Sequence, residues 1–244
     1  MSRPRRAPLN LSDSDGRLVI TAFEGAISVR ILAPPKDRAF VFEVVFRLDH
    51  PRLVALASQK PPLHFHPSQE EYMEVLEGRL CVEVDGQTRV LTREDGELCV
   101  LPWSHHRLYP PQIDSSETVT GGQRTVFLLS GSEADQLFKL DLVFFENWYA
   151  YQDDVIVGGN RANLFQVLSM FDAGGSYLSF PPWVPFGKYL SIALGIFVGR
   201  WMGSVLGYQP FYREWTTAGD WEAACHKMES SFFQRRFAKQ RKQT

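Results

Sequence analysis

Histidines and a glutamate are grouped in one stretch of this sequence at a spacing that suits metal ligation. His64 and His66 are separated by one residue, and Glu71 follows five residues later. Residues two apart on a strand face the same side of a sheet, so both imidazoles are expected to point into the same space. A second segment brings His105 and His106 to the end of another expected strand. Three imidazoles and one carboxylate would form a donor set suited to Fe, Mn, Ni, Zn or Cu.

The same residues also allow a site without metal. Histidine and glutamate side chains in a polar pocket can transfer protons directly. The sequence therefore leaves two alternatives open, a divalent metal centre (Fe, Mn, Ni or Zn) and a polar pocket that holds no ion.

The spacing of these residues resembles the two sequence motifs of the cupin superfamily. The first motif of that family has HxH, then three or four residues, Glu, six residues and Gly. The second motif begins with Gly followed, after five residues, by Pro. The residues that match are His64, His66, Glu71 and Gly78 in the first motif and Gly96 and Pro102 in the second.

The second motif departs from the family pattern after Pro102. Ser104 stands where glycine is expected, and Arg107 occupies the position of the motif histidine. His106 takes the family role if the turn is one residue shorter. Ser58 replaces a glycine that normally precedes the first histidine by six residues.

The resemblance implies a mainly β fold, a jelly-roll barrel of two antiparallel sheets with a site inside it. His64, His66, Glu71 and His106 would converge there as metal ligands, and the first three would carry the catalysis. The side chains expected to contact the substrate are Tyr72, Trp103 and Tyr109.

Short apolar or alternating segments separated by turn residues continue to about residue 145, which is typical of a β domain. Asp85-Gly86 is expected to form a tight hairpin turn. We predict a cupin β-barrel domain over residues 1–145 and a C-terminal α-helical extension over residues 146–244. The nine expected strands are Arg17–Ala22, Ile27–Leu32, Phe40–Leu48, Leu63–His66, Tyr72–Leu76, Arg79–Val84, Thr88–Leu91, Glu97–Leu101 and Val126–Leu129.

Helical spacing replaces this pattern after Phe145. Asn160 is expected to cap a helix that ends at Gly174-Gly175. Another helix is expected over about Lys188–Leu206, and a last one from near Asp220.

The helix expected over Lys188–Leu206 carries small residues at every fourth position, which leaves one smooth stripe along it. Two interpretations remain open. The helix is either buried against the barrel or a second subunit, or it associates with a membrane through residues 188–206. Arg200 opposes the membrane interpretation because a charge inside a bilayer is costly. The stripe consists of Gly187, Ser191, Gly195, Gly199, Gly203 and Gly207.

Composition restricts the partners and the compartment. The chain has 26 basic and 28 acidic residues and a net charge of -2, which offers no excess of positive charge for a nucleic acid. Its three cysteines form no CxxC pair, so neither a disulfide framework nor a cysteine-rich zinc site is expected. No apolar stretch follows the basic N-terminal segment, so we expect a cytoplasmic protein, free or membrane-associated.

Cupins host many reactions, so the fold alone does not define the activity. Aromatic residues make up 13% of the chain, which favours a roomy apolar pocket for a hydrophobic small molecule. The layout resembles fungal cupins, some of which accompany polyketide or terpenoid biosynthesis. We expect a non-redox lyase, isomerase or cyclase of secondary metabolism, acting as a monomer or a homodimer. The alternatives are an iron-dependent dioxygenase and a non-catalytic cupin that binds a small molecule.

Overall fold

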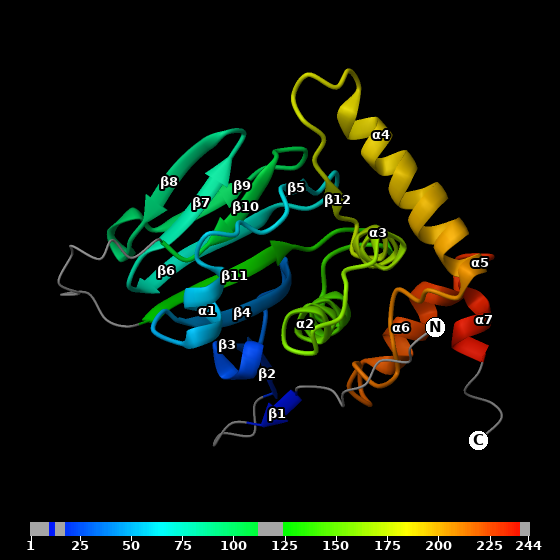
Figure 1. The fold of residues 1–244 in the computed structure, drawn as a ribbon, viewed down its shortest axis with the longest axis horizontal. Helices are drawn as coiled ribbons and strands as arrows, with labels where there is room; N and C mark the ends of the chain where they lie inside the picture. The colour runs from blue at the N-terminus through cyan, green and yellow to red at the C-terminus, as the bar shows by residue number, and fades with distance from the viewer. Residues whose placement is uncertain (1–9, 13–17, 112–123, 240–244) are drawn as a thin grey trace. The chain divides into compact units, whose positions relative to one another are not determined.

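The chain is described by a computed structural model that covers residues 10–12, 18–111 and 124–239 (Figure 1). Two compact units are present in it. The first, here called the β unit, consists of residues 10–65 and 69–134, and the second, the helical unit, of residues 66–68 and 135–239. The chain thus changes unit at Asp135, and the division into domains 1–145 and 146–244 stays a prediction.

Two antiparallel sheets form the β unit (Figure 1), which confirms the predicted fold class. The larger sheet has the strand order β1-β2-β3-β4-β11-β6-β9, and β5-β10-β7-β8 follow one another in the second. The strands are β1 (Asn10–Ser12), β2 (Leu18–Ala22), β3 (Ile27–Leu32), β4 (Arg38–Arg47), β5 (His64–Phe65), β6 (Glu71–Glu77), β7 (Leu80–Val84), β8 (Gln87–Leu91), β9 (Glu97–Val100), β10 (His106–Tyr109) and β11 (Arg124–Ser132).

Most of these strands follow the expected pattern, with differences at three places. β1 and β10 were not among the nine expected strands, and Arg17 lies outside the described residues. The expected hairpin turn is confirmed, because Val84 pairs with Gln87 and both Asp85 and Gly86 have positive φ angles, of 47° and 83°. Two central residues with positive φ define the turn type that matches the twist of paired strands.

Alternation along the strands builds the core of the β unit. Every second residue of β4 is buried between Phe40 and Phe46, as expected for a strand with one face turned inward. The short helix α1 (Pro51–Leu56) and two 3-10 turns, η1 (Phe23–Gly25) and η2 (Arg93–Asp95), connect strands of this unit. The inward-facing core residues are Phe40, Phe42, Val44 and Phe46 of β4, Met73 and Val75 of β6, and Phe127 and Leu129 of β11.

Side-chain caps mark the beginnings of the first two helices of the helical unit. The Asp141 carboxylate accepts a hydrogen bond from the Phe144 amide at 3.0 Å, and the Asn163 side chain accepts one from the Phe165 amide at 3.0 Å. The expected cap at Asn160 is therefore wrong, because Asn163 directly precedes the helix and satisfies its first free amides. The elements are α2 (Leu142–Ile156), α3 (Leu164–Ala173), β12 (Tyr177–Leu178), α4 (Gly187–Leu194), η3 (Gly195–Gly203), α5 (Ser204–Leu206), α6 (Trp221–Glu229) and α7 (Arg235–Lys239).

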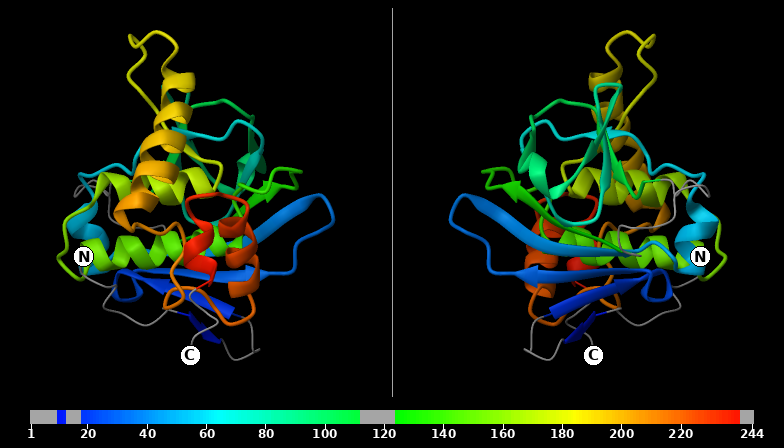
Figure 2. Two further views of the ribbon diagram at one scale, coloured as in Figure 1. Left: turned by 90° about the vertical axis from the view of Figure 1, so that its right-hand side faces the viewer. Right: turned by 90° about the vertical axis from the view of Figure 1, so that its left-hand side faces the viewer.

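One continuous helical rod, here called the long helix, extends over Gly187–Leu206 and is formed by α4, η3 and α5 (Figure 2). η3 is π-helical. In an α-helix, four residues overshoot one turn by about 40°, whereas the looser π-helical winding makes four residues fall short of a turn. Because the winding changes along the rod, small residues that recur at every fourth position stay on one side of it.

The stripe packs against the helical unit itself. A Cβ atom on Gly199 would lie 2.5 Å from the backbone carbonyl of Leu168 in α3, and one on Gly195 would lie 2.8 Å from the Tyr177 ring. Both glycines are buried. The close partner of the stripe is therefore α3 of the same chain.

Arg200 is turned inward from the same rod. Its Nε and Nη2 atoms donate to the two carboxylate oxygens of Asp172 at 2.6 and 2.9 Å, and its guanidinium lies 4.2 Å from the centre of the Phe138 ring. Asp172 is fully buried. A bidentate pair of this kind compensates both charges and adds a fixed geometry to the packing of the long helix on α3.

Gly199→Ala should lower stability, whereas Gly203→Ala should leave it unchanged or raise it. The added methyl at residue 199 meets backbone atoms that cannot move aside, so unfolding free energy should fall by about 1–3 kcal/mol. At residue 203 the nearest neighbours lie at 3.4 Å or more, so the higher helix propensity of alanine should leave stability equal or higher by up to about 1 kcal/mol. Thermal and urea unfolding of both variants measures this, and equal effects would contradict the packing on α3.

Candidate metal centre

Two neighbouring strands bring His64 and His106 together. β5 and β10 pair in antiparallel register with His106 directly opposite His64, and β10 continues the sheet by pairing with β7. Side chains directly opposite each other on paired strands stand on the same face. The two imidazole rings are accordingly 4.5 Å apart between centroids.

The larger sheet supplies the carboxylate. Glu71 is the first residue of β6, and it shares the buried face of that strand with Met73 and Val75. Its Oε2 atom lies 2.9 Å from Nε2 of His106, and both side chains are almost completely buried. This contact brings one residue from each sheet of the β unit into a single site.

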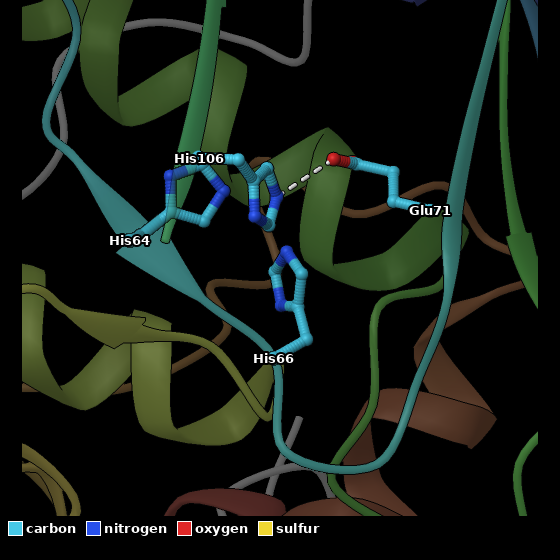
Figure 3. Close-up of side chains that lie close together, drawn as sticks. All are labelled: His64, His66, Glu71 and His106. Carbon is cyan, nitrogen blue, oxygen red and sulfur yellow. Dashed lines mark ion pairs between the residues drawn. The ribbon is translucent and has the colours of Figure 1, made fainter. Parts of the chain in front are cut away.

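His66 completes the group. It follows Phe65 of β5 directly in the chain, its side chain is buried, and Figure 3 shows it pointing toward the other three residues. One donor atom from each of His64, His66, Glu71 and His106 lies within 4.8 Å of the donors of the other three. Because metal–ligand bonds of about 2.0–2.2 Å place opposite donors about 4.0–4.4 Å apart, a small closure of this group would hold a divalent ion.

Backbone carbonyls orient two of the rings. Nδ1 of His64 lies 3.1 Å from the carbonyl oxygen of Pro62, and Nδ1 of His106 lies 2.9 Å from the carbonyl oxygen of Ser104. A carbonyl can only accept, so each Nδ1 donates its proton and each Nε2 is available to a metal. Such carbonyl contacts are a regular feature around metal-binding histidines. The sequence reasoning missed both anchors, although each stands two residues before the histidine that it orients.

Burial and charge set the protonation of these rings. Burial, assisted by the neighbouring His106, lowers the pKa of His64 to about 4, so this imidazole is neutral near pH 7. Burial also acts to lower the pKa of His106, but the hydrogen bond and the charge of Glu71 outweigh it and raise this pKa. The contact with Glu71 therefore favours the protonated form of His106, and a metal ion at Nε2 would have to displace that proton.

The structure settles which histidine of the second segment joins the group. His105 is outside it: its ring stands edge-on to the Phe65 ring at 5.5 Å. Arg107, which occupies the motif position, pairs with Glu83 through Nε and Nη2 at 2.9 and 2.8 Å. Because neighbouring residues of a strand point to opposite faces, His106 and Arg107 cannot both face the centre.

The three predicted substrate residues lie in different places. Tyr72 follows Glu71 on the opposite face of β6, where the Arg38 guanidinium covers its ring at 3.5 Å. The Tyr109 ring lies 4.9 Å from the ammonium group of Lys60. The Trp103 ring stacks on Phe65 with 5.7 Å between centroids. Their contact with a substrate stays a prediction.

Two antiparallel sheets carry His64, His66 and Glu71 at the positions of the first motif, and His106, one residue before the position of the motif histidine, joins them. This combination defines a member of the cupin superfamily. No protein-family model matches the sequence. An oxidoreductase from Arthrobotrys oligospora is 46% identical over 225 residues, which cover 91% of this chain and 86% of the relative. A protein from Aspergillus niger named probable oxidoreductase is 46% identical, covering 90% of this chain and 83% of its own length. The chain belongs to this family of fungal oxidoreductases.

One more distant relative and one solved structure complete these comparisons. An epoxidase from Aspergillus terreus is 36% identical over 91% of this chain and 70% of its own length. Among solved structures, an RmlC-like cupin from Shewanella frigidimarina is 17% identical, covers 52% of this chain and 96% of that chain, and has a TM-score of 0.35. At this score the structural likeness adds nothing to the family assignment.

The names of the relatives correct the expected reaction class. A non-redox lyase, isomerase or cyclase is wrong, because the relatives are named oxidoreductases and an epoxidase. That expectation rested on the altered second motif, yet His106 joins the group despite Ser104 and Arg107. The physical reason for the error is that one imidazole–carboxylate set suits both Lewis-acid and redox metals. The more general prediction, an enzyme whose side chains could bind a divalent metal, is confirmed.

Removal of one ligand should abolish tight metal binding. We expect wild-type protein stripped by a chelator to take up one equivalent of Fe(II), and His106→Ala to bind it at least about 100-fold more weakly, because an imidazole is lost and Glu71 is left buried without its partner. Calorimetric titration under anaerobic conditions and metal analysis measure this. His226→Ala, which removes a histidine of α6 in the helical unit, is the control and should bind like the wild type. Equal affinity of all three proteins would show that the group is not a metal site.

Proposed function

We propose that this chain is an iron-dependent oxidoreductase of secondary metabolism that uses dioxygen to oxidise a hydrophobic small molecule. The observation that carries the proposal is the group of three histidines and one glutamate, of which His66, Glu71 and His106 are buried. The oxidoreductase and epoxidase names of the relatives supply the reaction class.

A redox reaction narrows the choice of metal. Imidazole and carboxylate groups do not take up and release electrons themselves, so an oxidoreductase built on them needs a redox-active partner. Zinc has no redox chemistry, whereas histidine–carboxylate sites with open positions are typical of non-haem Fe(II) oxygenases. A bound iron ion would supply the electron transfer to dioxygen.

The residues of the centre have separate tasks in this proposal. His64 is neutral near pH 7 and presents Nε2, with its ring held by Pro62. Glu71, which contacts His106, would hold the ion through its carboxylate, whose negative charge would offset part of the charge of a divalent ion. Burial of His66, Glu71 and His106 excludes water, which limits side reactions of reactive species.

Trp103 is the predicted substrate residue that we retain in the proposal. Its ring stacks on Phe65, the residue between the two histidines of the first motif. Its φ angle of 69° is unusual for a residue with a large side chain. Residues held in such conformations cluster at functional sites, so we propose that Trp103 forms part of the wall that receives the apolar substrate.

Oxygen consumption coupled to product formation tests the proposed function. Fe(II)-loaded protein would be mixed with a panel of polyketide- and terpenoid-like compounds in an oxygen electrode, and products would be analysed by mass spectrometry. We expect at least one compound to be oxidised with matching oxygen uptake. His66→Ala should lower this rate by about 100-fold or more because it removes a ligand of the proposed ion.

The controls separate redox from non-redox chemistry. His226→Ala should keep the wild-type rate, and zinc-loaded wild type should be inactive because zinc cannot exchange electrons. Equal product formation under nitrogen, or by the zinc-loaded protein, would contradict an oxygen-dependent oxidation.

A further inference from the structure

The long helix has an exposed apolar side that the proposed function does not use. While its small residues face α3, large apolar side chains cover the remaining surface, and Val205 is 62% exposed. The helix is long and apolar enough to cross a membrane, yet only 28% of it is buried. We call this side, with its neighbours, the outer face: Trp183, Phe186, Tyr189, Leu190, Leu194, Phe197, Trp201, Met202, Val205, Leu206 and Phe232, all of which are exposed.

The outer face continues onto the segment between α6 and α7. The rings of Phe197 and Trp201 are in edge contact at 4.5 Å. Trp201 lies 6.0 Å from Phe233, whose ring is 5.3 Å from that of Phe232. A continuous apolar surface of this kind is unusual on a protein that has no partner there, and it marks an interaction site.

The long helix and the residues that flank it carry basic but no acidic side chains. Residues 181–210 contain no Asp or Glu, and acidic residues return only from Glu214 onward. Lys188 stands near the start of the long helix, and α7 carries Arg235, Arg236 and Lys239. The Arg236 guanidinium donates to the carbonyl of Ser204 and, at 3.4 Å, to that of Val205, which ties α7 to the end of the long helix.

The packing of the long helix excludes a spanning orientation. Arg200 is engaged with fully buried Asp172, and the backbone at Gly199 is in close contact with Leu168. Both contacts would be lost if the helix left α3 to enter lipid on all sides, and the separated charges would be costly in a bilayer. Only the outer face can enter an apolar environment. The long helix would therefore lie parallel to the membrane plane.

We propose that the outer face docks the protein onto an anionic phospholipid membrane, with the apolar side chains entering the boundary between headgroups and acyl chains. Tryptophan and tyrosine are enriched at this boundary, and basic residues at an apolar face favour anionic lipids. A second copy of the chain is the less favoured occupant. In a two-fold interface the same surface meets itself, so two long helices that carry no acidic residue would face each other and offer no acidic partner to each other's basic side chains.

Vesicle flotation with single-residue variants tests this proposal. Metal-loaded wild-type protein should float with vesicles of phosphatidylcholine and phosphatidylserine, and Val205→Glu should lower its partition coefficient by about tenfold or more because a charge enters the apolar layer. Val54→Glu is the matched control, since Val54 of α1 is 57% exposed and lies in the β unit. This variant should float like the wild type. Circular dichroism and thermal unfolding confirm that each variant is folded.

The role of the basic residues is tested separately. Arg235→Gln combined with Lys239→Gln should reduce binding to phosphatidylserine-containing vesicles and leave binding to pure phosphatidylcholine unchanged, and added salt should weaken the former. The proposal is overturned if wild-type protein does not float, or if Val205→Glu and Val54→Glu float equally. It is also overturned if sedimentation shows a wild-type dimer that Val205→Glu converts to a monomer, because a second copy would then cover the outer face.

Discussion

The contact between Glu71 and His106 is the interaction on which the candidate centre depends. It joins a residue of the larger sheet to a residue of the second, and the pairing of β10 with β5 extends it to His64. Because Glu71 and His106 are buried, their charges must be balanced by one another or by an ion. The strand pairings therefore place His64, His106 and Glu71 close together, in a geometry compatible with a divalent ion.

The long helix meets two different requirements on its two sides. Toward α3 it needs small residues, because the backbone of Leu168 leaves no room for a side chain at Gly199. Away from α3 it carries large apolar side chains without an acidic residue. Close packing explains why glycine stands at residues 195 and 199 at a cost in helix propensity.

The sequence predicted which side chains lie together better than it predicted the reaction. The spacing of His64, His66 and Glu71 identified the centre because period-two alternation determines which side chains share a face. β10 was not among the nine strands expected from the hydrophobic pattern, because its four residues are too few to show a clear alternation. Orienting carbonyls carry no residue signature, so Pro62 and Ser104 could not be found. The reaction class could not be derived at all, because the same donors bind redox and non-redox metals.

X-ray absorption spectroscopy at the iron edge of Fe(II)-loaded protein tests the central claim most directly. The claim is that His64, His66, Glu71 and His106 together hold one ion. The account predicts nitrogen and oxygen neighbours at about 2.0–2.2 Å, with the outer-shell scattering of three imidazoles. This scattering should fall to that of two imidazoles in His106→Ala. A spectrum of oxygen ligands without imidazole scattering, or one unchanged by His106→Ala, would contradict it.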